Sequence, residues 1–92
     1  MTFRIGFRTS ALQAIRALSK EDRKRIGIAL RQLEINPFPP RRPGADIKKL
    51  AGTKGRTEAY RLRVGPWRAI YAIAENEIDV RIFERKTDST YD

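Results

Sequence analysis

The stretch of sequence that decides the fold is AYRLRVGPWRAIYAI, residues 59–73. Its first half alternates apolar residues with arginines, which is the pattern of a β-strand with one buried face. Gly65-Pro66 then marks a turn. The second half, residues 67–73, is apolar on both faces except at Arg68, as is typical of a central strand. The stretch therefore predicts an antiparallel hairpin inside a sheet.

Two further strands are expected around this hairpin. Residues 75–77 turn the chain, and Ile78, Val80 and Ile82 are expected to face inward on a last strand. At the other end of the chain, residues 2–8 also alternate and predict a half-buried first strand.

Two helices are expected between the first strand and the hairpin. Thr9 or Ser10 is a suitable N-cap for the first helix, and Ser19 with Asp22 three residues later forms a capping box variant for the second. Apolar residues follow at helical spacing in both: Leu12, Ile15 and Leu18, then Ile26, Ala29, Leu30 and Leu33. The short connection predicts an antiparallel helical hairpin.

Residues 36–57 are expected to form a long, basic loop, because Asn36-Pro37 ends the second helix and further prolines and glycines follow. A loop of this length is uncommon in a compact domain and indicates either function or an unrecognised element. The predicted order is β-α-α-β-β-β, an α+β fold in which a helical hairpin packs on a small, mostly antiparallel sheet. Residues 1–92 are expected to form a single domain.

The composition excludes several kinds of site. Neither cysteine nor histidine is present, which removes disulfides, thiolate metal sites, the usual zinc ligand and the usual general base near neutral pH. We expect no metal and no cofactor. No apolar run approaches the roughly 20 residues of a membrane span, and the first residues do not resemble a signal peptide. A cytoplasmic protein is expected.

The net charge of +9 favours a polyanion or an acidic protein as partner. Arg61 and Arg63 would share one strand face roughly 7 Å apart, and the hairpin would bring Arg68 beside them. Arg85 follows at the end of the last strand, and Tyr91 lies six residues later. Arginine offers forked donors that match phosphate oxygens, so this group could clamp a phosphate. A solvated strand face is the alternative interpretation.

Three segments together resemble the RelE/ParE toxin superfamily. They are Lys49-Leu50-Ala51-Gly52, residues 60–71 with the form Y-R-x-R-x-G-x-x-R-x-x-Y, and residues 84–91. The resemblance covers nearly the whole chain and implies the toxin of a toxin–antitoxin pair. Members of the RelE branch cleave mRNA in the ribosomal A site without metal. Members of the ParE branch inhibit DNA gyrase and lack the ribonuclease residues.

The resemblance implies a catalytic set that matches the RelE branch: Arg61, Arg63, Arg68, Arg85 and Tyr91. In the implied reaction, the RNA 2′-hydroxyl attacks the adjacent phosphate. The first three arginines would stabilise the oxyanion, Arg85 would act near the leaving 5′-oxygen, and Tyr91 would stack on the base or take a proton. Lysine is common in the family at the positions of Arg61 and Arg63. Arginine, with a pKa above about 12, is a poor general base, which leaves the proton acceptor open.

The remaining expectations concern partners. Four basic residues are expected to bind RNA: Lys48, Lys49, Lys54 and Arg56. The implied partners are mRNA, the ribosomal A site and a cognate acidic antitoxin, with no membrane. Two alternatives stay open at this point: a ParE-like gyrase inhibitor without catalysis, and an RNA-binding relative without toxin activity.

Overall fold

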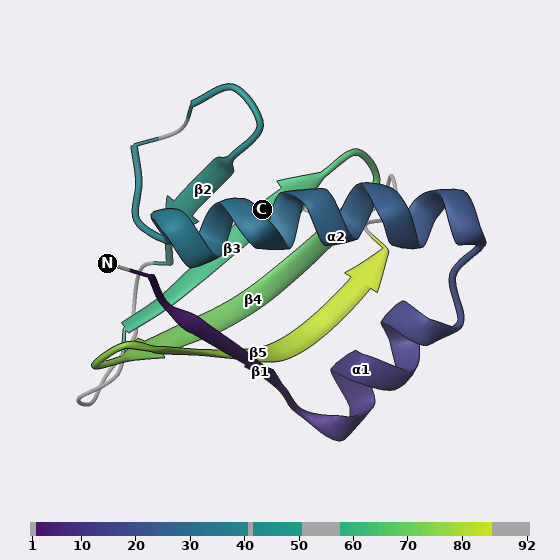
Figure 1. Cartoon of the computed structure of the whole chain (residues 1–92), viewed down its shortest axis with the longest axis horizontal. Helices are drawn as coiled ribbons and strands as arrows, with labels where there is room; N and C mark the ends of the chain where they lie inside the picture. The colour runs from purple at the N-terminus through teal and green to yellow at the C-terminus, as the bar shows by residue number, and fades with distance from the viewer. Residues whose placement is uncertain (1, 41, 51–57, 86–92) are drawn as a thin grey trace.

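The computed structural model describes residues 2–40, 42–50 and 58–85. Both helices lie on one side of a five-stranded sheet (Figure 1). The elements are β1 (Arg4–Phe7), α1 (Thr9–Arg16), α2 (Lys20–Ile35), β2 (Asp46–Lys49), β3 (Glu58–Val64), β4 (Trp67–Ala74) and β5 (Glu77–Arg85). The strand order is β1-β5-β4-β3-β2, with β1 parallel to β5 and every other pair antiparallel. The predicted α+β class and the mostly antiparallel sheet are confirmed.

The predicted long loop contains a strand that the sequence analysis did not recognise. β2 pairs with β3, and Ile47 lies opposite Leu62 with 3% of its surface exposed. β2 has one apolar residue among three charged ones, so its alternation is too short to identify. The expected order β-α-α-β-β-β is therefore corrected to β-α-α-β-β-β-β.

Of the two predicted helix N-caps, the structure has the one for α2 and lacks the one for α1. The hydroxyl of Ser19 accepts a hydrogen bond from the Asp22 backbone N–H at 3.2 Å, as the capping box predicts. α1 instead begins at Thr9 after an N-cap at Arg8 that makes no side-chain cap, so neither Thr9 nor Ser10 is the cap. α1 packs mainly against β5 rather than along α2 (Figure 1), so the two helices form a more open pair than predicted. Neither described helix is long and apolar enough to cross a membrane.

A β-bulge interrupts the pairing of β4 with β5. Ile70 lies opposite Ile82, and the next residue, Tyr71, lies opposite Val80, so Arg81 is an extra residue in β5. The alternation of β5 changes phase at this point. Ile82, predicted to face inward, is 45% exposed, and Phe83 takes the buried position.

The core lies between α2 and the adjacent sheet face, and its largest fully buried side chain is Tyr71. The Tyr71 ring stacks on Tyr60, with 5.7 Å between the centroids. Its hydroxyl donates a hydrogen bond of 2.8 Å to the carbonyl oxygen of Pro37. This bond ties the central strand to the segment that follows α2.

We expect Tyr71→Phe to destabilise the fold, because the buried Pro37 carbonyl loses its donor. The expected loss is about 1 kcal/mol of unfolding free energy, or a Tm lower by about 4–8 °C in a domain of this size. Thermal unfolding followed by circular dichroism measures it. Tyr60→Phe is the matched control, because its hydroxyl donates to the exposed Glu58 carboxylate. Equal Tm values for wild type and Tyr71→Phe would contradict this account.

We expect Glu75→Gly to stabilise the protein. Among the described residues other than glycine, only Glu75 has a positive φ, 56°, in the turn between β4 and β5. Glycine adopts this conformation without steric cost, so the unfolding free energy should rise by about 0.5–1 kcal/mol. Urea unfolding measures the change. Gly65→Ala is the converse variant, since Gly65 has the same φ in the other hairpin, and it should be less stable than wild type.

Candidate functional site

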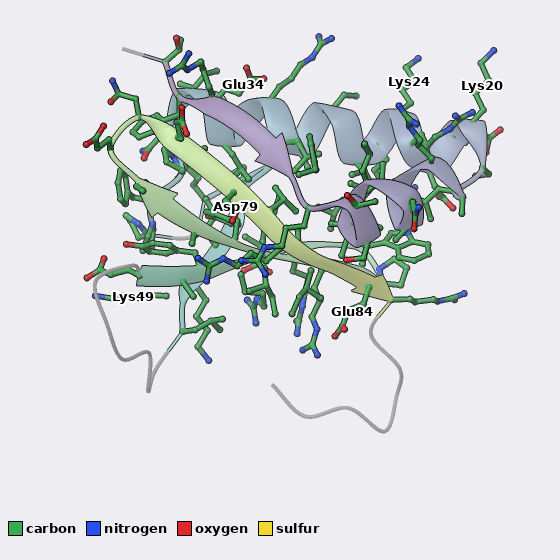
Figure 2. The ribbon with its side chains drawn as sticks, turned by 90° about the horizontal axis from the view of Figure 1, so that it is seen from below. Lys20, Lys24, Glu34, Lys49, Asp79 and Glu84 are labelled. Carbon is green, nitrogen blue, oxygen red and sulfur yellow. The ribbon has the colours of Figure 1, made fainter. Side chains whose placement is uncertain are left out.

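The face of the sheet away from α2 collects basic side chains. Because alternate residues of a strand point to opposite faces, burial of Tyr60 and Leu62 beneath α2 directs Arg61 and Arg63 to the other side. Arg68 lies directly opposite Arg63 in the β3–β4 register and shares its face. Figure 2 shows nitrogen-tipped side chains gathered on this side of the sheet, between the labelled Lys49 and Glu84. Three of the predicted site arginines are therefore brought together.

Lys48 adds a fourth positive charge, because it lies opposite Arg61 on β2. We call the surface formed by Lys48, Arg61, Arg63 and Arg68 the arginine face. Asp46 and Glu84 are carboxylates on the same face, opposite Arg63 and Arg68 respectively. Within this group of described residues, the four cations outnumber the two carboxylates, which leaves an excess of positive charge.

The register aligns four of these charged residues across four neighbouring strands. Asp46 on β2 lies opposite Arg63 on β3, which lies opposite Arg68 on β4, which lies opposite Glu84 on β5. We call these four residues the central row. Neighbouring strands are about 4.8 Å apart, so the row is about 15 Å long, with two arginines between two carboxylates.

Ion pairs fix the arginines in place. The Nε of Arg68 donates to Oε2 of Glu84 at 2.7 Å, and its Nη2 contacts the same oxygen at 2.5 Å. Nη2 of Arg61 lies 3.4 Å from Oδ1 of Asp46. The Arg61 side chain is only 9% exposed and that of Arg68 19%. The carboxylates offset repulsion between the guanidinium groups and fix their orientation. Guanidinium groups fixed in this way are rigid, forked donors, which suit the binding of an anion.

Lys49 points to the opposite side from Lys48. It lies opposite Tyr60, and its Nζ donates to Oε1 of Glu58 at 2.9 Å. This hydrogen bond, with a second from the Tyr60 hydroxyl, lowers the pKa of the Glu58 carboxyl. The predicted RNA-binding residues Lys48 and Lys49 are thus divided between the two faces, and Lys54 and Arg56 lie outside the described residues.

Arg85 is not brought onto the arginine face. It lies opposite Trp67, with its guanidinium carbon 5.8 Å from the centroid of the indole ring, in cation–π geometry. Trp67 in turn stacks on the buried ring of Phe83, with 5.5 Å between the centroids. The bulge at Arg81 causes this placement, because it changes the phase of every later residue in β5. Tyr91 lies outside the described residues, so the roles of both remain predictions.

Asp46 was not predicted to lie near the site, and Glu84, although close in sequence to Arg85, was not predicted to be catalytic. Asp46 lies in the unrecognised strand β2. If the alternation expected for Ile78, Val80 and Ile82 continued, Glu84 would lie on the helix side and Arg85 on the open side. The bulge reverses these two positions. No local signal for this exchange is present, because the bulge is defined by pairing with β4.

The described tyrosines do not supply a base. Burial raises the pKa of Tyr60 to about 12 and that of Tyr71 further, and both rings lie on the helix side. In residues 2–40, 42–50 and 58–85, no three acidic side chains are close enough to hold a metal ion.

A cleft of about 600 Å³ adjoins one end of the central row. Arg63 and Asp46 line it together with Ala29, which lies in α2, and Arg42, which follows α2 in the chain. Arg42 also donates hydrogen bonds to the carbonyl oxygens of Asn36 and Phe38, at 2.5 and 3.0 Å, which holds the segment after α2 against this cleft. The positive surface therefore continues around the edge of the sheet.

No protein-family model matches the chain, and no curated protein sequence matches it significantly. Solved structures do match. A chain of the archaeal RelE–RelB complex from Pyrococcus horikoshii OT3 is 28% identical and superposes with a TM-score of 0.80, over 97% of this chain and 100% of that one. A chain of the RelB–RelE antitoxin–toxin complex from Methanococcus jannaschii is 22% identical, with a TM-score of 0.65 over 86% and 87% of the two chains. At 22% identity, the second match shows a shared fold alone. The first match shows sequence similarity as well, over almost the whole chain.

Proposed function

We propose that this chain, which belongs to the RelE toxin family by its fold and its likeness to the Pyrococcus horikoshii structure, is the toxin of a toxin–antitoxin pair. We further propose that it is a metal-independent endoribonuclease that cleaves mRNA in the ribosomal A site, in the cytoplasm. The observation that carries this proposal is the arginine face. Arg61, Arg63 and Arg68 are held on one surface by neighbouring strands, in an arrangement suited to a phosphodiester.

The proposed reaction breaks one P–O5′ bond. The 2′-oxygen of a nucleotide attacks its own 3′-phosphate, and the 5′-oxygen of the next nucleotide leaves and takes up a proton. The products are a 2′,3′-cyclic phosphate and a 5′-hydroxyl end. Negative charge grows on the non-bridging oxygens in the transition state, and donors from Arg63 and Arg68 would stabilise it there. Arg61, buried and paired with Asp46, would add to the positive potential beneath them.

Arg85 and Tyr91 remain proposed members of the site. Arg85 lies at the end of β5, next in sequence to Glu84, and would reach the leaving oxygen after its guanidinium leaves the Trp67 ring. An RNA-binding relative without nuclease activity is the second candidate, and the observed position of Arg85 favours it.

A cognate antitoxin is the second proposed partner. The two solved structures described above are complexes of RelE with RelB. An acidic segment would neutralise the arginine face and exclude RNA from it. The outer side of α2 is a further candidate contact, because Ile28 and Ile35 are 57% and 65% exposed there, close in sequence to Lys24 and Arg31. Apolar residues flanked by lysine and arginine suit an acidic amphipathic helix.

We expect Arg68→Ala to lower mRNA cleavage by about 10²–10³-fold, because it removes donors that stabilise the growing charge. Primer extension in a ribosome-containing translation extract maps and counts the new 5′ ends. Arg4→Ala is the control, since Arg4 is an exposed arginine at the far edge of the sheet, paired only with the exposed Glu77 in the described part of the chain. Wild-type protein that leaves all mRNA intact would contradict the nuclease proposal, and an Arg68→Ala variant of full activity would contradict the site.

We expect Lys48→Ala, but not Lys49→Ala, to weaken binding of a single-stranded RNA oligonucleotide. The two variants lose the same charge at neighbouring positions on opposite faces of the sheet. A lost phosphate contact reduces the slope of log K against log salt by about 0.7 for single strands. Fluorescence anisotropy at several salt concentrations gives the slope for each variant. Equal slopes for the two variants would show that RNA does not bind on the arginine face.

A further inference from the structure

The proposed cleavage needs a group that takes the proton of the attacking 2′-hydroxyl. The arginines cannot, because a guanidinium group keeps its proton at physiological pH. The described tyrosines lie on the other face with raised pKa values. Carboxylates, unlike the cations of the arginine face, are unprotonated at neutral pH, so the described carboxylates on the open side of the sheet are the candidates. Glu77 lies near the edge of the sheet in its pair with Arg4, and Asp46, Asp79 and Glu84 differ sharply in their surroundings.

Asp46 and Asp79 are poorly placed for this role. The Asp46 side chain is 26% exposed and paired with the buried Arg61. Asp79 is engaged through Oδ2 by both Arg8, at 3.7 Å, and Arg81, at 3.3 Å. It also lies beyond the bulge, opposite Ala72, several residues along β5 from the central row.

Glu84 has the geometry of an oriented base. Arg68 holds it through one oxygen only, because both Nε and Nη2 contact Oε2. Among the described residues, Oε1 accepts no hydrogen bond, and the side chain is 43% exposed. Figure 2 shows Glu84 projecting from β5 on the side of the sheet away from α2. The carboxylate is thus held through one oxygen at one end of the arginine pair, in a side chain that is partly open to solvent.

We propose that Glu84 is the general base of the cleavage reaction, an inference that rests on the proposed nuclease function. Oε1 accepts the proton of the 2′-hydroxyl while the 2′-oxygen forms its bond to phosphorus and the P–O5′ bond breaks. The 5′-oxygen takes its proton from solvent. A phosphate bound over Arg63 and Arg68 lies next to Glu84 in the central row.

The ion pair with Arg68 gives the proton transfer an electrostatic advantage. Before the reaction, the Glu84 carboxylate offsets the charge of Arg68. When Glu84 takes the proton it becomes neutral, and the positive charge of Arg68 is no longer offset. At that moment the phosphorane acquires additional negative charge, which Arg68 can then stabilise.

The test is Glu84→Gln, which keeps the shape of the side chain and its hydrogen bond to Arg68 but cannot accept the proton. We expect the single-turnover cleavage rate on ribosomes to fall by about 10²–10⁴-fold. The affinity for RNA should stay within about two-fold of wild type or become tighter, because a negative charge is lost beside the phosphate. Glu84→Asp, which retains a carboxylate, should recover part of the rate.

Glu77→Gln is the matched control, since it removes the same charge from the other end of β5, where Glu77 pairs with Arg4. A melting temperature for each variant confirms that the fold is intact. If wild type cleaves mRNA and Glu84→Gln cleaves it equally fast or faster, Glu84 serves only as a counter-ion to Arg68. That result overturns this inference but not the proposed function. Wild type that does not cleave mRNA overturns the proposed function and this inference with it.

Discussion

Burial of the apolar side of β3 and β4 beneath α2 is the constraint on which the arrangement of this protein depends. Tyr60, Leu62 and Tyr71 are all at most 3% exposed. Because strand side chains alternate, their burial leaves Arg61 and Arg63 no place except the opposite face. A slip of one residue in either strand would move arginines into the core, so the register is strongly specified. The arginine face is therefore a direct consequence of how the core is packed.

The β-bulge at Arg81 then decides which residues join that face. If Arg81 were instead paired in a regular ladder, Phe83 would lie opposite Arg68, and Glu84 would lie opposite Trp67 on the helix side. With it, Glu84 meets Arg68, and Arg85 meets Trp67. Bulges re-aim side chains in this way and are frequent beside functional sites. The bulge thus places a carboxylate, rather than the ring of Phe83, at the end of the central row.

The sequence was sufficient to predict those features that depend on residues close together in the chain. The hairpin of residues 59–73 and the Ser19 cap depend on neighbouring residues, and both were predicted correctly. β2 was missed because it has a single core residue, Ile47, and becomes a strand through pairing with β3. The bulge was missed because it exists only relative to β4. The arginines of the candidate site were thus predictable from alternation, whereas the carboxylates that face them required the tertiary register.

A site built from arginine rather than lysine or histidine separates two tasks. Arginine stays charged at any physiological pH and presents a planar fork, so it binds phosphate well and accepts protons poorly. A nuclease that relies on it must take its base from another residue type. In the central row, two carboxylates offset the charge of the guanidinium groups, and one of them, Glu84, is the proposed proton acceptor. In the proposed mechanism, the Arg68–Glu84 pair neutralises charge in the resting site, and the charge of Arg68 is left to stabilise the phosphate once Glu84 has taken the proton.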